Sequence, residues 1–164
     1  MSDDENTVKH IELEGKWVQS NGTEIEIKEG EVIFGGEPYE RHGVSSSVCY
    51  TEGTWRGRWY YIAREDQTLL VVHGTEAISA TRQDNGKYLY QDKEIEIGQS
   101  KIREGQTTVT YDNTTWECHL LNPSVSEQRF GRDGSIWYYC ERTDGDLEVF
   151  ARTFVSLSYK AARV

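Results

Sequence analysis

A segment of fourteen residues occurs twice in the chain, and this repetition limits the folds that the sequence can adopt. Trp59–Val72 and Trp137–Phe150 are identical at seven of fourteen positions, among them the opening Trp-Tyr-Tyr. Only about one identity is expected by chance in such a window at average composition. Two shorter matches precede the segment in the same order. Gly-Lys-Trp parallels Gly-Lys-Tyr 71 residues later (15–17 and 86–88), and Glu-Ile-Glu-Ile recurs after 70 residues (24–27 and 94–97).

This internal similarity indicates a structural unit that is present twice. The sequence predicts one β domain at 12–155, which contains repeat A at 12–73 and repeat B at 83–151. Residues 1–11 are predicted to form an acidic N-terminal arm. Residues 156–164 are predicted to form a C-terminal tail, either a last strand or a frayed end.

The residue types favour strands joined by tight turns. The chain has ten Tyr, five Trp and fifteen Gly but one Met, and aromatic residues suit a pleated sheet while glycine suits turns. The clearest hairpin turns at Glu29-Gly30. Pairing about this turn places Ile25, Ile27, Val32 and Phe34 on one face, with polar residues on the other.

The repeated segment predicts a second hairpin in each half. Two-residue turns are expected at Asp66-Gln67 and at Asp144-Gly145. Pairing about these turns places two matched sets of residues on a common core face: Tyr60, Ile62, Leu69 and Val71 in the first copy, and Tyr138, Cys140, Leu147 and Val149 in the second. We therefore predict an all-β fold, an antiparallel barrel or two-sheet sandwich of about eight strands made from the two duplicated halves.

Gly15-Lys16-Trp17 resembles the G-x-W opening of lipocalin-like barrels. The match covers three residues on one predicted strand. The resemblance implies a calycin-like barrel architecture, and we carry over the architecture alone.

Charge and motifs narrow the classes of partner. The formal charge of −10 argues against nucleic acid and anionic membranes, which attract clustered Lys and Arg. There is no apolar stretch long enough for a membrane span, and the acidic start is unlike a signal peptide, so a cytoplasmic location is expected. The three cysteines, Cys49, Cys118 and Cys140, are odd in number and widely spaced, which does not suit a disulfide framework, so buried free thiols are expected. No metal or cofactor site is expected, because the sequence has no metal-ligand spacing and no catalytic motif.

Rings and arginines supply the candidate site. The residues chosen are Trp55, Trp59, Tyr61, Trp137 and Tyr139 as ring contacts, with Arg64 and Arg142 as possible anion anchors. We interpret the chain as a non-catalytic binding protein, with an aromatic-lined pocket or patch for a small apolar or aromatic ligand or a protein partner.

Two alternatives stay open. The same rings and arginine stems are also typical of a core, which would leave a protein-interaction or structural subunit without a cavity. A small barrel-type enzyme with acid–base chemistry would use buried ionisable groups such as Tyr60, Tyr138, Glu141 or the scattered His residues. No motif selects a catalytic residue among them.

Overall fold

Every regular element in the described part of the computed structural model is a β-strand, which confirms the predicted all-β fold. The structure describes residues 11–53, 58–129, 135–152 and 158–164, and these ranges contain sixteen strands and no helix. Paired strands are antiparallel throughout. Within the described part of the chain, no helix is long and apolar enough to cross a membrane.

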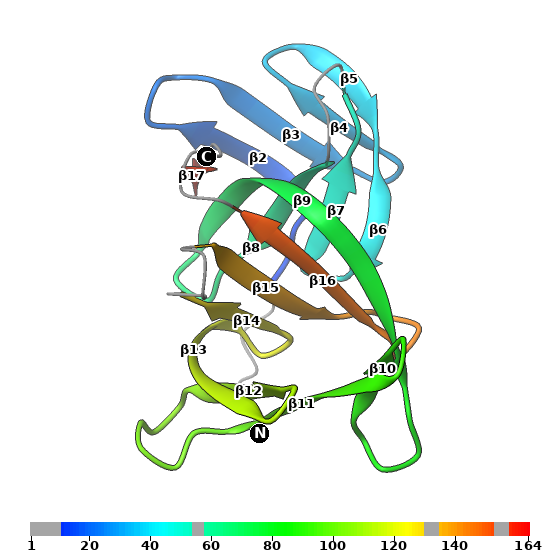
Figure 1. The fold of residues 1–164 in the computed structure, drawn as a ribbon. Coiled ribbons are helices and arrows are strands. Elements are labelled where there is room, and N and C mark those ends of the chain that lie inside the picture. The colour runs from blue at the N-terminus through cyan, green and yellow to red at the C-terminus, as the bar shows by residue number, and fades with distance from the viewer. Residues whose placement is uncertain (1–10, 54–57, 130–134, 153–157) are drawn as a thin grey trace, which may run out of the picture.

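Eight strands close into a barrel, as predicted, and we call this barrel the closed ring (Figure 1). Its strands are β9 (Thr68–Arg82), β10 (Tyr88–Tyr90), β11 (Lys93–Gln99), β12 (Thr107–Tyr111), β13 (Thr114–Asn122), β14 (Val125–Gln128), β15 (Ile136–Glu141) and β16 (Leu147–Arg152). Closure occurs at β9, whose C-terminal half pairs with β16 on one edge and with β10 on the other.

The remaining strands lie outside the closed ring, and we call them the outer strand set. They are β2 (Gly15–Gln19), β3 (Glu24–Lys28), β4 (Glu31–Phe34), β5 (Glu37–Glu40), β6 (His42–Ser45), β7 (Val48–Thr51), β8 (Arg58–Ala63) and β17 (Ser158–Arg163). The N-terminal half of β9 pairs with β8 on one edge and with β17 on the other. On the first edge, the strand order continues from β8 through β7 to β6. On the second edge, it continues from β17 through β2, β3 and β4 to β5.

The closed ring therefore draws mainly on the second half of the chain, and the strands outside it were not expected. Figure 1 shows β9 passing through both groups of strands. The outer strand set is nearly a ring itself. The two ends of its strand order, β5 and β6, are consecutive in the chain, with only Arg41 between them. Tight glycine turns make this possible. Gly35 and Gly36 adopt φ values of +58° and +87°, which glycine tolerates best, so the chain turns tightly from β4 into β5. Within the described part of the predicted tail, Ser158–Arg163 form a last strand, β17.

The predicted hairpin at 25–34 is confirmed in register. Ile25 pairs with Phe34 and Ile27 with Val32. Gly30 in the turn has φ +79°. Three of the four apolar residues are buried, and Phe34 packs against them from a half-buried position.

The predicted register of the repeated hairpin is wrong by one residue. Ala63 pairs with Leu69 and Glu141 with Leu147, so each loop has three residues between hydrogen-bonded ends, 65–67 and 143–145, rather than a two-residue turn. A three-residue loop places a residue with positive φ last. Gln67 at +70° and Gly145 at +95° take that place.

The corrected register exchanges the faces of one strand in each hairpin, because neighbouring side chains alternate. Tyr60 and Ile62 share a face with Leu70 and Val72, not with Leu69 and Val71. The physical reason lies in the loop. The Asp66 carboxylate accepts hydrogen bonds from the amide and hydroxyl of Thr68, which lengthens the turn by one residue.

Both faces of these hairpins are buried, and three apolar cores result. The outer core fills the outer strand set with Leu13, Trp17, Ile25, Ile27, Val32, Cys49, Tyr61, Ala63, Leu69, Val71 and Ala161. The ring core fills the closed ring with Ala80, Tyr88, Ile95, Val109, Cys118, Tyr139, Leu147 and Val149. The middle core lies between the two groups of strands and contains Val44, Val48, Tyr60, Ile62, Leu70, Val72, Leu121, Val125, Tyr138, Cys140 and Phe150.

Candidate functional site

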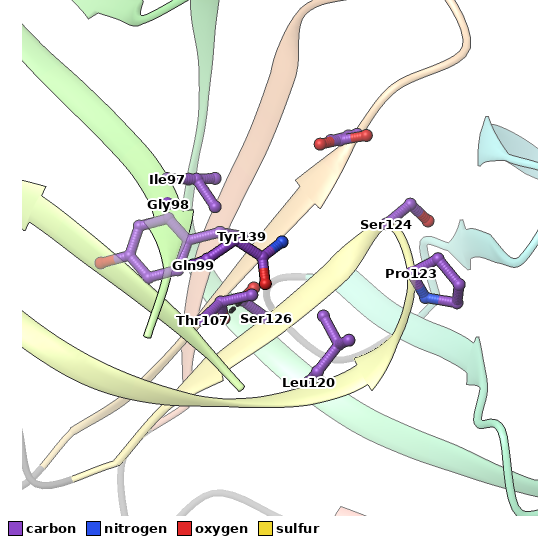
Figure 2. Close-up of a pocket in the computed structure, with 10 residues that line it drawn as sticks. Ile97, Gly98, Gln99, Thr107, Leu120, Pro123, Ser124, Ser126 and Tyr139 are labelled. Carbon is purple, nitrogen blue, oxygen red and sulfur yellow. Dashed lines mark hydrogen bonds between the residues drawn. The ribbon is translucent and has the colours of Figure 1, made fainter. Parts of the chain in front are cut away.

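A pocket of about 210 Å³ lies at one end of the closed ring, and we call it the ring pocket (Figure 2). It is formed where β11, β13 and β15 end and where β12 and β14 begin. Ile97, Leu120 and Pro123 give it apolar surface. Its volume is below the roughly 300–1,000 Å³ typical of ligand pockets, so only a small molecule would fit in it.

Hydroxyl groups lie at the buried side of the ring pocket. The hydroxyls of Thr107 and Ser126 are 2.8 Å apart, and either can donate to the other. Each hydroxyl has one hydrogen and two lone pairs, so this bond uses only part of what the two residues offer. Ser124 donates to the Asn122 side-chain oxygen at 3.1 Å.

Tyr139 forms a wall of the ring pocket. Its hydroxyl donates to Gln128 Oε1 at 2.7 Å, so the ring is held in place. Burial raises the pKa of Tyr139, with Cys118 and Tyr111 adding to the effect. The phenol therefore remains neutral and serves as a hydrogen-bonded wall rather than as a base.

The mouth of the ring pocket carries negative charge. Gln99 and Glu141 are exposed there, and Figure 2 shows the Gln99 amide in the middle of the view. Among the described residues that line the pocket, Glu141 is the only carboxylate and there is no Lys, Arg or His. A neutral or cationic polar molecule fits such a lining better than an anion does.

The other predicted ring contacts lie apart from this pocket. Trp59 and Tyr61 face the outer core, where Tyr61 is buried and Trp59 lies 5.0 Å from His73 between ring centroids. Trp137 packs half-buried against the ring core. Trp55 lies outside the described residues. Of the four rings that the structure describes, only Tyr139 lines the ring pocket, because the two repeated strands turn their Trp and Tyr toward different cores.

The two predicted anion anchors already have carboxylate partners. Arg64 lies 3.7 Å from Asp66 at an exposed loop. Arg142 contacts Asp144 at 3.2 Å and Glu148 at 2.8 Å. Neither arginine lines the ring pocket.

A buried carboxylate that sequence reasoning missed lies beside the middle core. The side chain of Glu148 is 3% exposed. One carboxylate oxygen accepts hydrogen bonds from Arg58 at 2.8 Å and from the Tyr60 hydroxyl at 2.6 Å, and the other accepts from Arg142. Burial and this hydrogen bond raise the pKa of Tyr60. The repeat held a signal for this site, because Glu148 stands where the first copy has the apolar Leu70.

Three stacked rings fill the middle core next to this carboxylate. Phe150 stacks on Tyr60 at 3.6 Å between centroids with planes 2° apart, and on Tyr138 at 5.0 Å and 14°. Gly74 makes the close stack possible. A Cβ at Gly74 would lie 2.7 Å from the Tyr60 ring and 2.9 Å from Phe150. This stack is packing, with all three rings buried.

The three cysteines are free and buried, which confirms their prediction. Burial raises the pKa of Cys49 and of Cys118 to about 12, and the reactive form of cysteine is the thiolate. We expect Ellman's reagent at pH 8 to modify the folded protein at least about 100-fold more slowly than the urea-unfolded chain, because access and ionisation are both reduced. Rapid labelling of one thiol per chain under native conditions would contradict this expectation.

No three or more His, Cys, Asp or Glu side chains within the described ranges are grouped so that they would hold a metal ion.

Comparison with known proteins finds no matching family model, no similar curated protein and no similar solved structure.

Proposed function

We propose that the protein is a non-catalytic binding protein that holds a small neutral or cationic polar molecule in the ring pocket. One observation carries the proposal. The closed ring has a pocket at one end, whereas residues of the chain itself fill the corresponding end of the outer strand set. We also propose that the two groups of strands derive from duplicated units, which makes this difference between them meaningful.

The filled end of the outer strand set is built from residues 11–14 and Arg41. Leu13 is 1% exposed, and its carbonyl accepts a hydrogen bond from the Trp17 indole at 3.1 Å. Arg41 forms an ion pair with Glu14 at 2.9 Å and donates to the Lys28 carbonyl at 2.8 Å. The segment and the ion pair occupy the space beside the end of β3.

The corresponding end of the closed ring has smaller groups. The chain turns directly from β9 into β10, since the Gln83 amide donates to the Lys87 carbonyl at 2.8 Å. On β13, Cys118 pairs with Thr107 of the pocket. In the outer strand set, Arg41 takes the corresponding position, where its backbone amide donates a hydrogen bond to the Gly30 carbonyl. A cysteine in place of an arginine leaves volume, which supports a pocket kept open for an occupant.

The polar lining favours a polar occupant over the apolar or aromatic ligand expected from the sequence. The hydroxyls of Thr107 and Ser126, the Gln99 amide and the Glu141 carboxylate together offer donors and acceptors to hydroxyl or ammonium groups. Of the groups considered for acid–base chemistry, Tyr60 and Tyr138 are buried in the middle core. Only Glu141 lies at the pocket.

Native mass spectrometry of the protein isolated from its own cells tests this function. We expect a small polar molecule to leave on denaturation. Gln99→Trp places a large ring at the pocket mouth, so occupancy should fall about tenfold or more, equivalent to at least about 1.4 kcal/mol of binding free energy.

Glu96→Trp is the matched control, because Glu96 is exposed on the same strand and pairs with Thr110 away from the pocket. It should retain the molecule as the unaltered chain does. Equal occupancy in the two variants would place the ligand elsewhere. A bare chain under all conditions, with no thermal shift from polyols, sugars or amines, would overturn the proposal.

A further inference from the structure

We infer that the two halves of the chain have exchanged their closing strands, so that each half completes the strand group of the other. The inference concerns which residues stabilise which strands, and it is independent of any ligand.

The two strand groups correspond pair by pair. Their first hairpins have the same register, as four residue pairs show: Ile25–Phe34 with Ile27–Val32 in β3–β4, and Ile95–Tyr111 with Ile97–Val109 in β11–β12. The next strand pair is irregular at the same point in both groups. The register shifts between Gly43 and Ser45 in β6–β7, and between Leu120 and Asn122 in β13–β14.

The closing strands occupy equivalent positions in these two groups. β17 lies between β9 and β2, with Ala161 opposite Leu69 and Arg163 opposite Trp17. The C-terminal half of β9 lies between β16 and β10. There Ala80 is opposite Leu147 and Arg82 is opposite Tyr88.

The equivalence identifies the exchange. Leu69 matches Leu147, and Trp17 matches Tyr88, in the sequence repeats. The strands opposite them both end in Ala-x-Arg, at 80–82 and at 161–163. Yet 80–82 belong to the first half of the sequence and complete the closed ring, whereas 161–163 belong to the second half and complete the outer strand set.

The path of β9 favours this arrangement over an unexchanged one. Without exchange, the chain after Val72 would turn back and pair within the outer strand set. Instead β9 continues unbroken from Thr68 to Arg82 and carries the chain into the closed ring. In an unexchanged chain, β17 would lie beside β16 and β10, but its partners are β9 and β2.

The terminal arginines anchor the exchanged strands. The Arg163 guanidinium lies 4.0 Å over the Trp17 ring and donates to the carbonyls of Glu12 at 2.6 Å and Glu14 at 3.0 Å. In the closed ring, Arg82 interacts electrostatically with the phenol of Tyr88. Each arginine joins the end of one half to the beginning of the other.

Hydrogen-exchange mass spectrometry of the full-length chain tests the inference with two matched variants. Arg163→Gln should accelerate amide exchange about tenfold in Gly15–Lys28 and leave Tyr88–Gln99 unchanged, because it removes a cation–π contact and charged hydrogen bonds. Arg82→Gln should produce the opposite pattern, with faster exchange in Tyr88–Gln99 only.

The crossed pattern is the result that the exchange predicts. If Arg163→Gln accelerates exchange in Tyr88–Gln99 while Gly15–Lys28 stays protected, the closing strands are not exchanged. Equal effects on both segments, or no effect in either variant, also overturn the inference. Should Arg163→Gln fail to fold, Arg163→Lys keeps the charge but loses the planar stacking and the second donor group, and the same segments are compared at smaller amplitude.

Discussion

Replacing both arginines that bind Glu148, in the double variant Arg58→Met/Arg142→Met, is expected to lower the free energy of unfolding by about 3–5 kcal/mol. The Glu148 side chain is 3% exposed, so the variant leaves a buried carboxylate, and the Tyr60 hydroxyl is its remaining hydrogen-bond donor among the described residues. Urea unfolding at pH 7 measures the loss.

Arg64→Met provides the matched control, since Arg64 stands in the first repeat where Arg142 stands in the second. Its partner Asp66 is exposed and 3.7 Å away, so we expect a change below about 1 kcal/mol. Glu148→Leu tests the same cluster from the other side. Because Leu70 fills the matched position, this change should cost less than the double variant. Equal losses for the control and the double variant would show that Glu148 is not held as described.

Phe150→Ala is expected to lower the free energy of unfolding by about 3–5 kcal/mol. Phe150 lies between Tyr60 and Tyr138 in the ring stack of the middle core, and all three rings are buried. The rings cannot easily close the resulting cavity, because the Tyr60 hydroxyl donates a hydrogen bond to Glu148 and the Tyr138 hydroxyl accepts one from Arg152. The same urea titration reports this loss.

Phe34→Ala makes the same chemical change at a half-buried position beside the outer core, and it should cost clearly less. Phe150→Leu keeps most of the volume and should fall between the two. A Phe150→Ala loss no larger than that of Phe34→Ala would mean that the middle core does not join the two groups of strands.

Features that depend on residues close together in the sequence were predictable, and features that depend on distant residues were not. The hairpin at 25–34 was predicted in register, because a glycine turn and strict alternation fix it locally. The repeated hairpin was displaced by one residue, because its loop length depends on the hydrogen bonds that Asp66 accepts from Thr68. The partners of β17 were beyond prediction, since they depend on pairing with residues more than 85 positions away.

The candidate site was predictable only in part. Tyr139 was chosen as an aromatic contact and lines the ring pocket. Thr107, Ser126 and Gln99 were not, because polar residues on a strand also suit a solvated face and nothing in their spacing marks the end of a barrel. Glu148 was missed, although it occupies the position in the second repeated segment that Leu70 occupies in the first. Comparing the two copies residue by residue, and asking where an apolar residue has become charged, would have found it.

The pairing of β2 with β17 determines how the molecule would respond to load. These are the first and last described strands, and they are antiparallel neighbours in which Trp17 lies opposite Arg163 and the Val164 amide donates to the Lys16 carbonyl. A force that pulls on the two ends therefore acts across the strands at the open end of one hydrogen-bonded pair. Such a force breaks the hydrogen bonds between the two strands one after another, in an unzipping geometry, rather than all at once in shear. The outer strand set would yield at low tension, and the closed ring, sealed by the far half of β9, would bear the load afterwards.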